Sequence, residues 1–346
     1  MKVYYNSFLL FLVLVVASSA VFPQDKTALA RQHYELGRKL YRAGHSDQAI
    51  EELYTALSLQ EVFFKAQYLL GRLLIDVGRY QEAVATLNAI DPVRWETARV
   101  QKLLGKAYYE MNQLKLAGRR LDQAIARSKR PDYELHYFLG LVKLRQGDAA
   151  AAVREEKRAA ELNPGFAPAQ KALSDSYLME GEYAEAEKSL TRYLAQIDDE
   201  METSVLEERL QGIRVLAQAK PESSVRKPIT KPKIKRMSVP IYTEQARRYR
   251  VEGAVRVEAL FATDGTIPHA FVVQGLGFGL DEAALRVARE IEFEPGEVDG
   301  QPTPMWIGVS IVFSIFEEEI KVKDDSRIAL ITAGGRENGR VIKRRH

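Results

Sequence analysis

The sequence predicts a multidomain fold, in which an all-α solenoid of helix pairs precedes a small α+β domain with a three-stranded antiparallel sheet. Three observations support this prediction. A pair formed by leucine and a small residue recurs every 34 or 35 residues in the first part of the chain, a basic segment with three prolines interrupts this pattern, and hydrophobic alternation with a period of two follows. The length of 346 residues accommodates about two domains.

Composition and charge argue against several classes of function. Apolar residues make up 46% of the chain and charged residues 28%, as in an ordinary globular protein. The net charge of +3 is too small to indicate nucleic-acid binding. The chain has no cysteine, so it forms neither a disulfide nor a cysteine-ligated metal site. Its five histidines lack metal-ligand spacing, so we expect no metal, no other cofactor and no enzymatic activity.

The N-terminal residues have the features of an export signal. Lys2 precedes an apolar run from Phe8 to Val16, and small residues from Ala17 to Ala20 follow it. This pattern predicts a signal peptide at residues 1–20 that is cleaved after Ala20. The alternative is a short uncleaved anchor, at the lower limit of the roughly 20 apolar residues that a membrane-spanning helix needs.

The first domain, predicted at residues 26–219, contains an internal repeat. The pair of leucine and a small residue stands at Leu36-Gly37, Leu70-Gly71, Leu104-Gly105, Leu139-Gly140 and Leu173-Ser174, and an alanine follows each pair at Ala49, Ala83, Ala117, Ala152 and Ala186. Small residues let the two helices of a repeat cross closely, and a leucine fills the remaining gap in most repeats (Leu53, Leu87, Leu121 and Leu190). Glu156 takes the leucine position in the fourth repeat, which we therefore expect to pack more loosely.

These residues resemble the tetratricopeptide repeat (TPR) family over residues 30 to about 200, with Pro164 at the position that ends a repeat. The resemblance implies about five helix pairs stacked into a solenoid, which the amphipathic segment 200–219 would cap. Solenoids of this family present a concave surface to a partner. We therefore expect the repeats to bind a peptide or a protein.

Residues 220–236 are predicted to form a basic linker between the two domains. The segment contains three prolines and seven basic residues against the single acidic residue Glu222. Such a composition favours an extended, solvated chain of polyproline character. Contact of its positive charges with an acidic partner is the alternative.

The second domain is predicted at residues 237–320. Two alternating strands flank a turn at Asp264-Gly265, a short helix at 242–250 precedes them, and a helix at 281–290 follows. In the last strand one face carries Met305, Ile307, Val309, Ile311, Phe313 and Ile315, and the other carries Trp306, Gly308, Ser310, Val312, Ser314 and Phe316. The order helix, strand, strand, helix, strand predicts a three-stranded antiparallel sheet.

A glycine-rich stretch lies between the second strand and the second helix of this domain. Gly275 and Gly277 fit the first two positions of the dinucleotide-binding pattern G-x-G-x-x-G, but the third position falls on Leu280. The glycines are therefore expected to form a turn with positive φ, and Asp281 is expected to cap the following helix.

Two motifs of this domain resemble the TonB C-terminal domain family over residues 238–316. The first carries Pro240, Tyr242, Ala246, Arg247 and Gly253, and the second carries Gly279, Leu280, Asp281, Glu282, Ala283, Ala284, Leu285, Phe293, Pro295, Gly300 and Pro302. The resemblance implies a periplasmic domain that binds an extended segment at the N-terminus of an outer-membrane transporter. An exposed strand edge can bind such a segment through its unpaired N–H and C=O groups.

The last strand, 304–316, is the docking edge that the resemblance implies. The expected peptide-binding residues are Trp306, Ile307, Gly308, Val309, Ser310, Val312, Ser314 and Phe316. In the alternative interpretation this strand is central in the sheet or pairs with a second copy in a homodimer. The tail at 321–346 is expected to be disordered, although its apolar stretch 328–332 could add a short strand.

The sequence thus predicts a periplasmic adaptor that docks a transporter segment on its sheet and holds a second partner on its repeats. The alternative function is an inner-membrane-anchored energy transducer of the TonB type. Transducers of that family carry a histidine in their N-terminal membrane helix, and the apolar segment here has none. This difference favours the adaptor.

Overall fold

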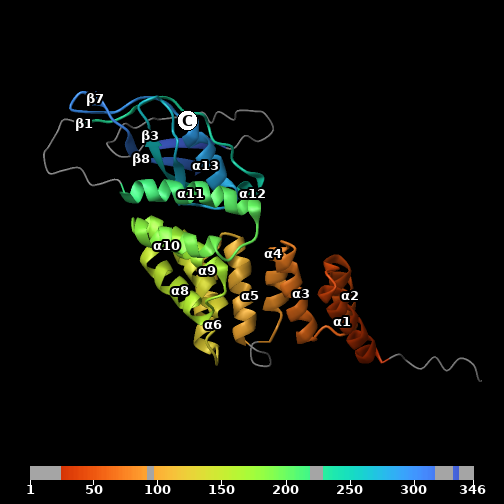
Figure 1. Cartoon of the computed structure of the whole chain (residues 1–346). Helices are drawn as coiled ribbons and strands as arrows, with labels where there is room; N and C mark the ends of the chain where they lie inside the picture. The colour runs from red at the N-terminus through yellow and green to blue at the C-terminus, as the bar shows by residue number, and fades with distance from the viewer. Residues whose placement is uncertain (1–24, 92–96, 219–228, 316–329, 335–346) are drawn as a thin grey trace, which may run out of the picture. The chain divides into compact units, whose positions relative to one another are not determined.

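The computed structural model describes residues 25–91, 97–218, 229–315 and 330–334 (Figure 1). The predicted signal peptide at residues 1–20 lies outside them. The chain divides into two compact units, one ending at Ala107 and the other beginning at Tyr108. The two units are described separately.

The first unit consists of helix pairs. Its helices are α1 (Lys26–Arg42), α2 (Ser46–Leu59), α3 (Phe64–Asp76), α4 (Tyr80–Asn88) and most of α5 (Thr97–Glu110). The predicted close crossings are present, because a Cβ atom on Gly37 would lie 3.1 Å from the Ala49 carbonyl oxygen. Gly44 and Gly78 have positive φ in the turns that follow α1 and α3, where a glycine avoids backbone strain.

The second unit begins with more helix pairs of the same kind. They comprise α6 (Leu114–Arg127), α7 (Tyr133–Arg145), α8 (Ala149–Leu162), α9 (Ala167–Glu180) and α10 (Tyr183–Leu194), followed by α11 (Glu200–Gln218). Glu156 is fully buried, and a Cβ atom on Gly140 would lie 2.5 Å from its Cγ. The fourth repeat is therefore as closely packed at its helix crossing as the second repeat, where Gly71 meets Leu87 at the same distance.

The three-stranded antiparallel sheet predicted for the second domain is present and gains a fourth strand. Strands β4 (Ala270–Gln274), β3 (Gly253–Phe261) and β8 (Met305–Ser314) pair antiparallel in that order, and β9 (Leu330–Gly334) adds to β8 in parallel. The expectations of a disordered tail at Leu330–Gly334, and of β8 as an edge strand along its whole length, are therefore wrong. The physical reason is that an unpaired strand edge attracts any apolar segment of high β propensity, and Leu330-Ile331-Thr332 is such a segment.

The C-terminal part of the predicted linker is paired rather than solvated. Strand β1 (Ile229–Thr230) pairs with β6 (Glu297–Val298), which also pairs with β7 (Gln301–Pro302), while β2 (Lys233–Arg236) pairs with β5 (Glu292–Glu294). The prediction of a free linker at 220–236 is thus wrong for residues 229–236, and residues 219–228 lie outside the described parts. The reason is that Ile234 packs against the core opposite Phe293, while acidic residues of β5 pair with Lys235 and Arg236.

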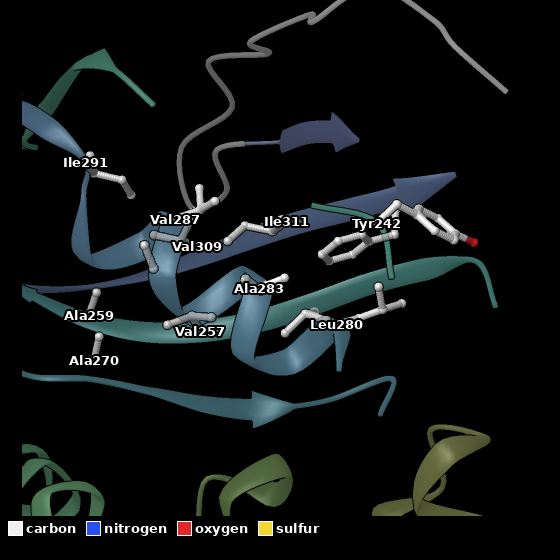
Figure 2. Packing of buried hydrophobic residues seen from close by; sticks show 14 of the residues in the cluster. Tyr242, Val257, Ala259, Ala270, Leu280, Ala283, Val287, Ile291, Val309 and Ile311 are labelled. Carbon is white, nitrogen blue, oxygen red and sulfur yellow. The ribbon is translucent and has the colours of Figure 1, made fainter. Parts of the chain in front are cut away.

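Helices cover both faces of the four-stranded sheet within this unit. On one face, α12 (Glu244–Arg248) and α13 (Leu280–Arg289) enclose the main core; Figure 2 shows Val257, Val309 and Ile311 of the sheet packed with Ala283 and Val287 of α13. On the other face, Phe271 and Val273 of β4 form a second core with α9, α10 and α11. This second core covers β4 and Trp306 of β8, while Arg256 on the same face of β3 is exposed.

Candidate peptide-binding edges of the sheet

Strand β8 carries most of the residues that the sequence predicts for peptide binding. Its inner side pairs with β3 along its length, from Met305 opposite Phe261 to Phe313 opposite Gly253. Its outer side pairs with β9 from Ser310 to Ser314. Among the described residues, no strand pairs with the outer side of Met305–Val309, which we call the open rim. An unpaired edge is therefore present over half of the strand on which the sequence analysis expects docking.

The apolar face of β8 anchors the open rim in the core. Val309 is fully buried beneath α13, and the half-buried Ile307 packs against the same core (Figure 2). The alternation predicted for this strand is thus present. These two side chains stabilise the strand within the domain. Ile307 and Val309 would therefore contact a docked segment through their main-chain groups.

Trp306 lies on the opposite face and contacts its own chain. Its indole ring stacks on the His269 ring with centroids 6.4 Å apart and tilts against the Phe271 ring at 5.8 Å. The tryptophan thereby joins the core formed with α11. A ring held in this way offers a rigid apolar surface beside the open rim.

Gly308 makes room for a half-buried carboxyl group. A Cβ atom at this position would lie 3.1 Å from Oε1 of Glu258, which stands opposite on β3. Burial raises the pKa of Glu258 above its ordinary value. The glycine therefore has a packing role on this face, and it keeps the open rim free of a side chain at its centre.

The other predicted residues lie beneath or beyond β9. Ser310 is buried and stands beside Leu330, Val312 stands beside Thr332, and Ser314 stands beside Gly334. Phe316 falls outside the described residues. The structure therefore brings Trp306 to Val309 together on an accessible edge and places Ser310 to Ser314 along the occupied half.

The N–H groups of the glycine-rich loop before α13 bind the carboxylate of Asp281. Asp281 Oδ1 accepts hydrogen bonds from the N–H groups of Leu276 (2.8 Å) and Gly277 (3.1 Å), and a Cβ atom on Gly275 would collide with this carboxylate. The helix cap is Gly279 with φ of 75°, so the expectation that Asp281 caps α13 is wrong. Burial raises the pKa of Asp281, and the two N–H donors lower it. The loop thus satisfies internally the N–H groups that a phosphate would need.

The opposite edge of the sheet is β4, which the sequence analysis does not identify as a site. Its inner side pairs with β3, and no strand in the described ranges pairs with its outer side. There, the Val272 carbonyl oxygen accepts a hydrogen bond from Arg209 of α11 at 3.1 Å, and Arg209 also pairs with Asp175 of α9 at 2.6 Å. Nothing in the sequence indicates that Arg209 of α11 contacts a strand more than sixty residues away.

The described residues contain no group of three or more histidine, aspartate or glutamate side chains able to hold a metal ion. None of the helices in the described ranges combines the length and the apolar character needed to span a membrane.

Helical repeats joined to a small sheet with an open strand edge define a class of protein built from protein-interaction modules. The family comparisons agree. Residues 238–315 match the model described as Gram-negative bacterial TonB protein C-terminal, and residues 40–107 and 102–165 match two tetratricopeptide repeat models. The chain therefore carries a TonB C-terminal domain, typical of Gram-negative envelope proteins, preceded by TPR repeats.

Several solved structures are similar to about half of this chain. The type IV pilus biogenesis factor PilW is 18% identical, with a TM-score of 0.50, over 55% of this chain and 88% of its own. PilF of Pseudomonas aeruginosa is 21% identical, with a TM-score of 0.48, over 56% of this chain and 86% of its own. MamA is 23% identical, with a TM-score of 0.43, over 49% and 91%. These likenesses concern the fold alone, and no curated protein sequence gives a match.

Proposed function

We propose that the protein is an adaptor of the cell envelope, in which the sheet docks an extended segment of an outer-membrane transporter while the repeats bind a second protein. The observation that supports the docking most directly is the open rim of β8 within a TonB C-terminal domain. The export signal expected at residues 1–20 would deliver the protein to the periplasm, where such a segment is accessible.

Strand addition on the open rim would use main-chain groups first. An unpaired strand edge presents N–H and C=O groups that bind a guest strand whatever its side chains, and neighbouring side chains then select among guests. Trp306 supplies an apolar surface on one face, and Gly308 leaves the middle of the rim unobstructed. The guest would therefore be a short extended segment of about five residues, which is the usual length of a strand.

Strand β9 supports this mode of binding because it already uses the outer side of β8. It pairs in parallel with Ser310–Ser314, so this side of β8 accepts a parallel partner. A guest either pairs with Met305–Val309 beside β9 or replaces β9 and takes the whole edge. In the second case, removal of residues 321–346 would strengthen guest binding.

The test uses the full-length protein and a synthetic peptide of the N-terminal periplasmic segment of an outer-membrane transporter from the same cell. Hydrogen exchange measured by mass spectrometry should slow at Met305–Val309 when the peptide is added. Two copies of the peptide, N-methylated at alternate residues in opposite frames, serve as matched controls. Only one copy should lose affinity, because a guest strand points every second N–H group toward its neighbour.

The proposal fails if both N-methylated copies bind like the parent peptide, or if the peptide protects residues outside β8 and leaves the open rim unchanged. The same experiment on the chain that ends at residue 320 separates the two docking modes. Tighter binding to this truncated chain shows that the guest replaces β9, and equal binding shows that the guest lies beside it.

A further inference from the structure

A cavity of about 620 Å³ lies beside the β4 edge of the sheet, within the second unit. The cavity is lined by residues of α7, α9 and α11, and by residues of β4, the glycine-rich loop that follows it and α13. Its volume is in the range of cavities that hold several residues of an extended peptide or a small ligand. It is distinct from the open rim, which lies on the other side of β3.

We propose that this cavity binds an extended acidic peptide of a partner protein, with one carboxylate of the peptide held by Arg145 and its main chain lying along β4. The inference deepens the second half of the proposed function, since it says where the repeat helices take their partner and with what chemistry. It does not depend on the open rim of β8.

Arg145, at the end of α7, is a cation held in place without an acidic partner. Its guanidinium carbon lies 4.0 Å from the centre of the Tyr109 ring and 4.9 Å from that of Phe278. One of its nitrogens donates a long hydrogen bond of 3.4 Å to the Tyr109 carbonyl oxygen. Among the described residues, no carboxylate forms an ion pair with it. A guanidinium that is oriented by two rings and still has unused N–H groups is suited to bind a carboxylate.

The other cations of the cavity wall are engaged within the protein, whereas its carboxylates include Asp199 and Glu282, which form no ion pair among the described residues. Lys171 pairs with Glu202 at 2.6 Å, and Arg289 pairs with Glu208 at 2.6 Å. Asp281 accepts the two main-chain N–H groups of the glycine-rich loop. Of the cations in the wall, Arg145 is therefore the one that no carboxylate of the described residues pairs with, so it is the group that can bind a carboxylate of a ligand.

Apolar side chains of α11 are exposed at the cavity. Met201 is 81% exposed and Val205 is 61% exposed, and both line it. Exposed side chains of this size next to a cavity are typical of a binding surface. They would contact the apolar side chains of a bound peptide, while Arg145 would bind its acidic residue.

The main chain of β4 offers hydrogen-bonding groups on the same side. The N–H group of Leu260 donates to the His269 carbonyl oxygen, and Phe271 stands opposite Glu258, so Ala270 and Val272 direct their main-chain groups away from β3. Arg209 donates a hydrogen bond to the Val272 carbonyl oxygen. The N–H groups of Ala270 and Val272 can therefore donate to a ligand. A peptide in extended conformation matches this spacing.

The test selects ligands with the full-length protein from a phage-displayed library of random seven-residue peptides. The enriched peptides should share an acidic residue next to apolar positions, and they should slow hydrogen exchange at Ala270–Gln274. Arg145→Gln should weaken binding of an enriched peptide about tenfold, the expected loss for a charge-assisted hydrogen bond. Arg154→Gln, which changes an exposed arginine of α8 outside the cavity, is the matched control and should leave binding unchanged.

A second pair of variants keeps the test valid if Arg145 also stabilises the fold. Val205→Glu places a negative charge at the cavity on an exposed site and should weaken binding about tenfold by charge repulsion. Ser204→Glu adds the same charge one position earlier on α11, outside the cavity lining, and should bind like the wild-type protein.

Three outcomes would overturn the inference: a selection that enriches no acidic peptide, equal binding by the Val205 and Ser204 variants, or protection at Met305–Val309 instead of β4. A large gain in affinity after removal of residues 317–346, which include several acidic residues, would assign the cavity to the chain's own tail and would also overturn it. Failure of the transporter peptide on β8 leaves this result unaffected, so the two proposals fail separately.

Discussion

The second and fourth helical repeats cross with the same geometry and different chemistry. A Cβ atom on Gly71 would lie 2.5 Å from Leu87 Cγ, and a Cβ atom on Gly140 would lie 2.5 Å from Glu156 Cγ. Leu87 and Glu156 are both buried, at 1% and 0% exposure. The repeat therefore constrains the volume at the helix crossing more strictly than its polarity, as expected for an interior that is packed like a crystal.

The difference lies in what the buried carboxyl group needs. Glu156 Oε2 accepts a hydrogen bond from Ser176 Oγ at 2.7 Å, while Oε1 is buried without a hydrogen-bond partner. The pKa of Glu156 is raised to about 8, mainly by burial; the hydrogen bond from Ser176 lowers it in part, and the neighbouring charge of Asp175 adds to the rise. At neutral pH the group is therefore mostly protonated. The fourth repeat, whose helix α7 carries Arg145, is built around a buried polar group, so we expect it to be less stable than the second repeat.

The largest expected effect comes from replacing the residue at each helix crossing with alanine and comparing the loss of stability. Leu87→Ala should destabilise the second repeat by about 2–5 kcal/mol, because it removes buried methyl groups and leaves a cavity. Glu156→Ala removes a similar volume but also removes an unsatisfied oxygen, so its loss should be clearly smaller. Hydrogen exchange of the amides of α3–α4 and α7–α8 measures the two local stabilities. Equal losses would show that the polarity of the crossing has no energetic consequence.

The next effect is a dependence on pH that only the fourth repeat should show. A group whose pKa is higher in the folded than in the unfolded protein stabilises the fold at low pH, and this stabilisation is lost as the pH rises. For Glu156 the loss should extend from its ordinary value of 4.5 to about 8 and amount to something on the order of 3 kcal/mol. Thermal unfolding from pH 5 to pH 8.5 should therefore show a slope that Glu156→Gln reduces, while Glu258 and Asp281, whose pKa values burial also raises, contribute the remainder. A slope that this substitution leaves unchanged would assign the pH dependence to those other groups.

The sequence analysis predicts contacts between residues that are close in the sequence better than contacts between residues that are far apart. Gly71 and Leu87 are sixteen residues apart and belong to a local repeat, so periodicity alone predicts their contact. The core strands are predictable from alternation. The sequence analysis names a short strand near β9 only as the alternative to disorder and does not predict the pairing of Ile234 with Phe293, because short strands depend on a partner far along the chain. The place of Arg145 between two rings likewise depends on tertiary structure, which composition does not encode.

A third prediction concerns a variant that has leucine at the helix crossing of the fourth repeat, as the other repeats do. Glu156→Leu puts the residue of the second repeat into the fourth, where Gly140 leaves the same space. The substitution should stabilise the α7–α8 pair by about 1–3 kcal/mol at pH 7, because it removes a buried polar atom that lacks a partner. The midpoint of urea denaturation should rise, and peptide binding in the cavity should persist because Arg145 is unchanged. A lower midpoint would show that Ser176 and Glu156 contribute more than a leucine would.

The smallest expected effect tests whether close fit, rather than glycine itself, distinguishes the crossings. A Cβ atom on Gly118 of α6 would meet Val142 Cγ1 at 3.6 Å, an ordinary contact, whereas one on Gly140 would meet Glu156 Cγ at 2.5 Å. Gly118→Ala should therefore stabilise the protein by about 0.5–1 kcal/mol through helix propensity, and Gly140→Ala should destabilise it by about 1–3 kcal/mol through overpacking. Opposite shifts in the urea midpoint would show that a glycine is needed at position 140 because α7 and α8 approach closely there. Shifts of the same sign would mean that helix α7 tolerates a side chain at its closest approach to α8, and the packing rule inferred from the repeat would not hold there.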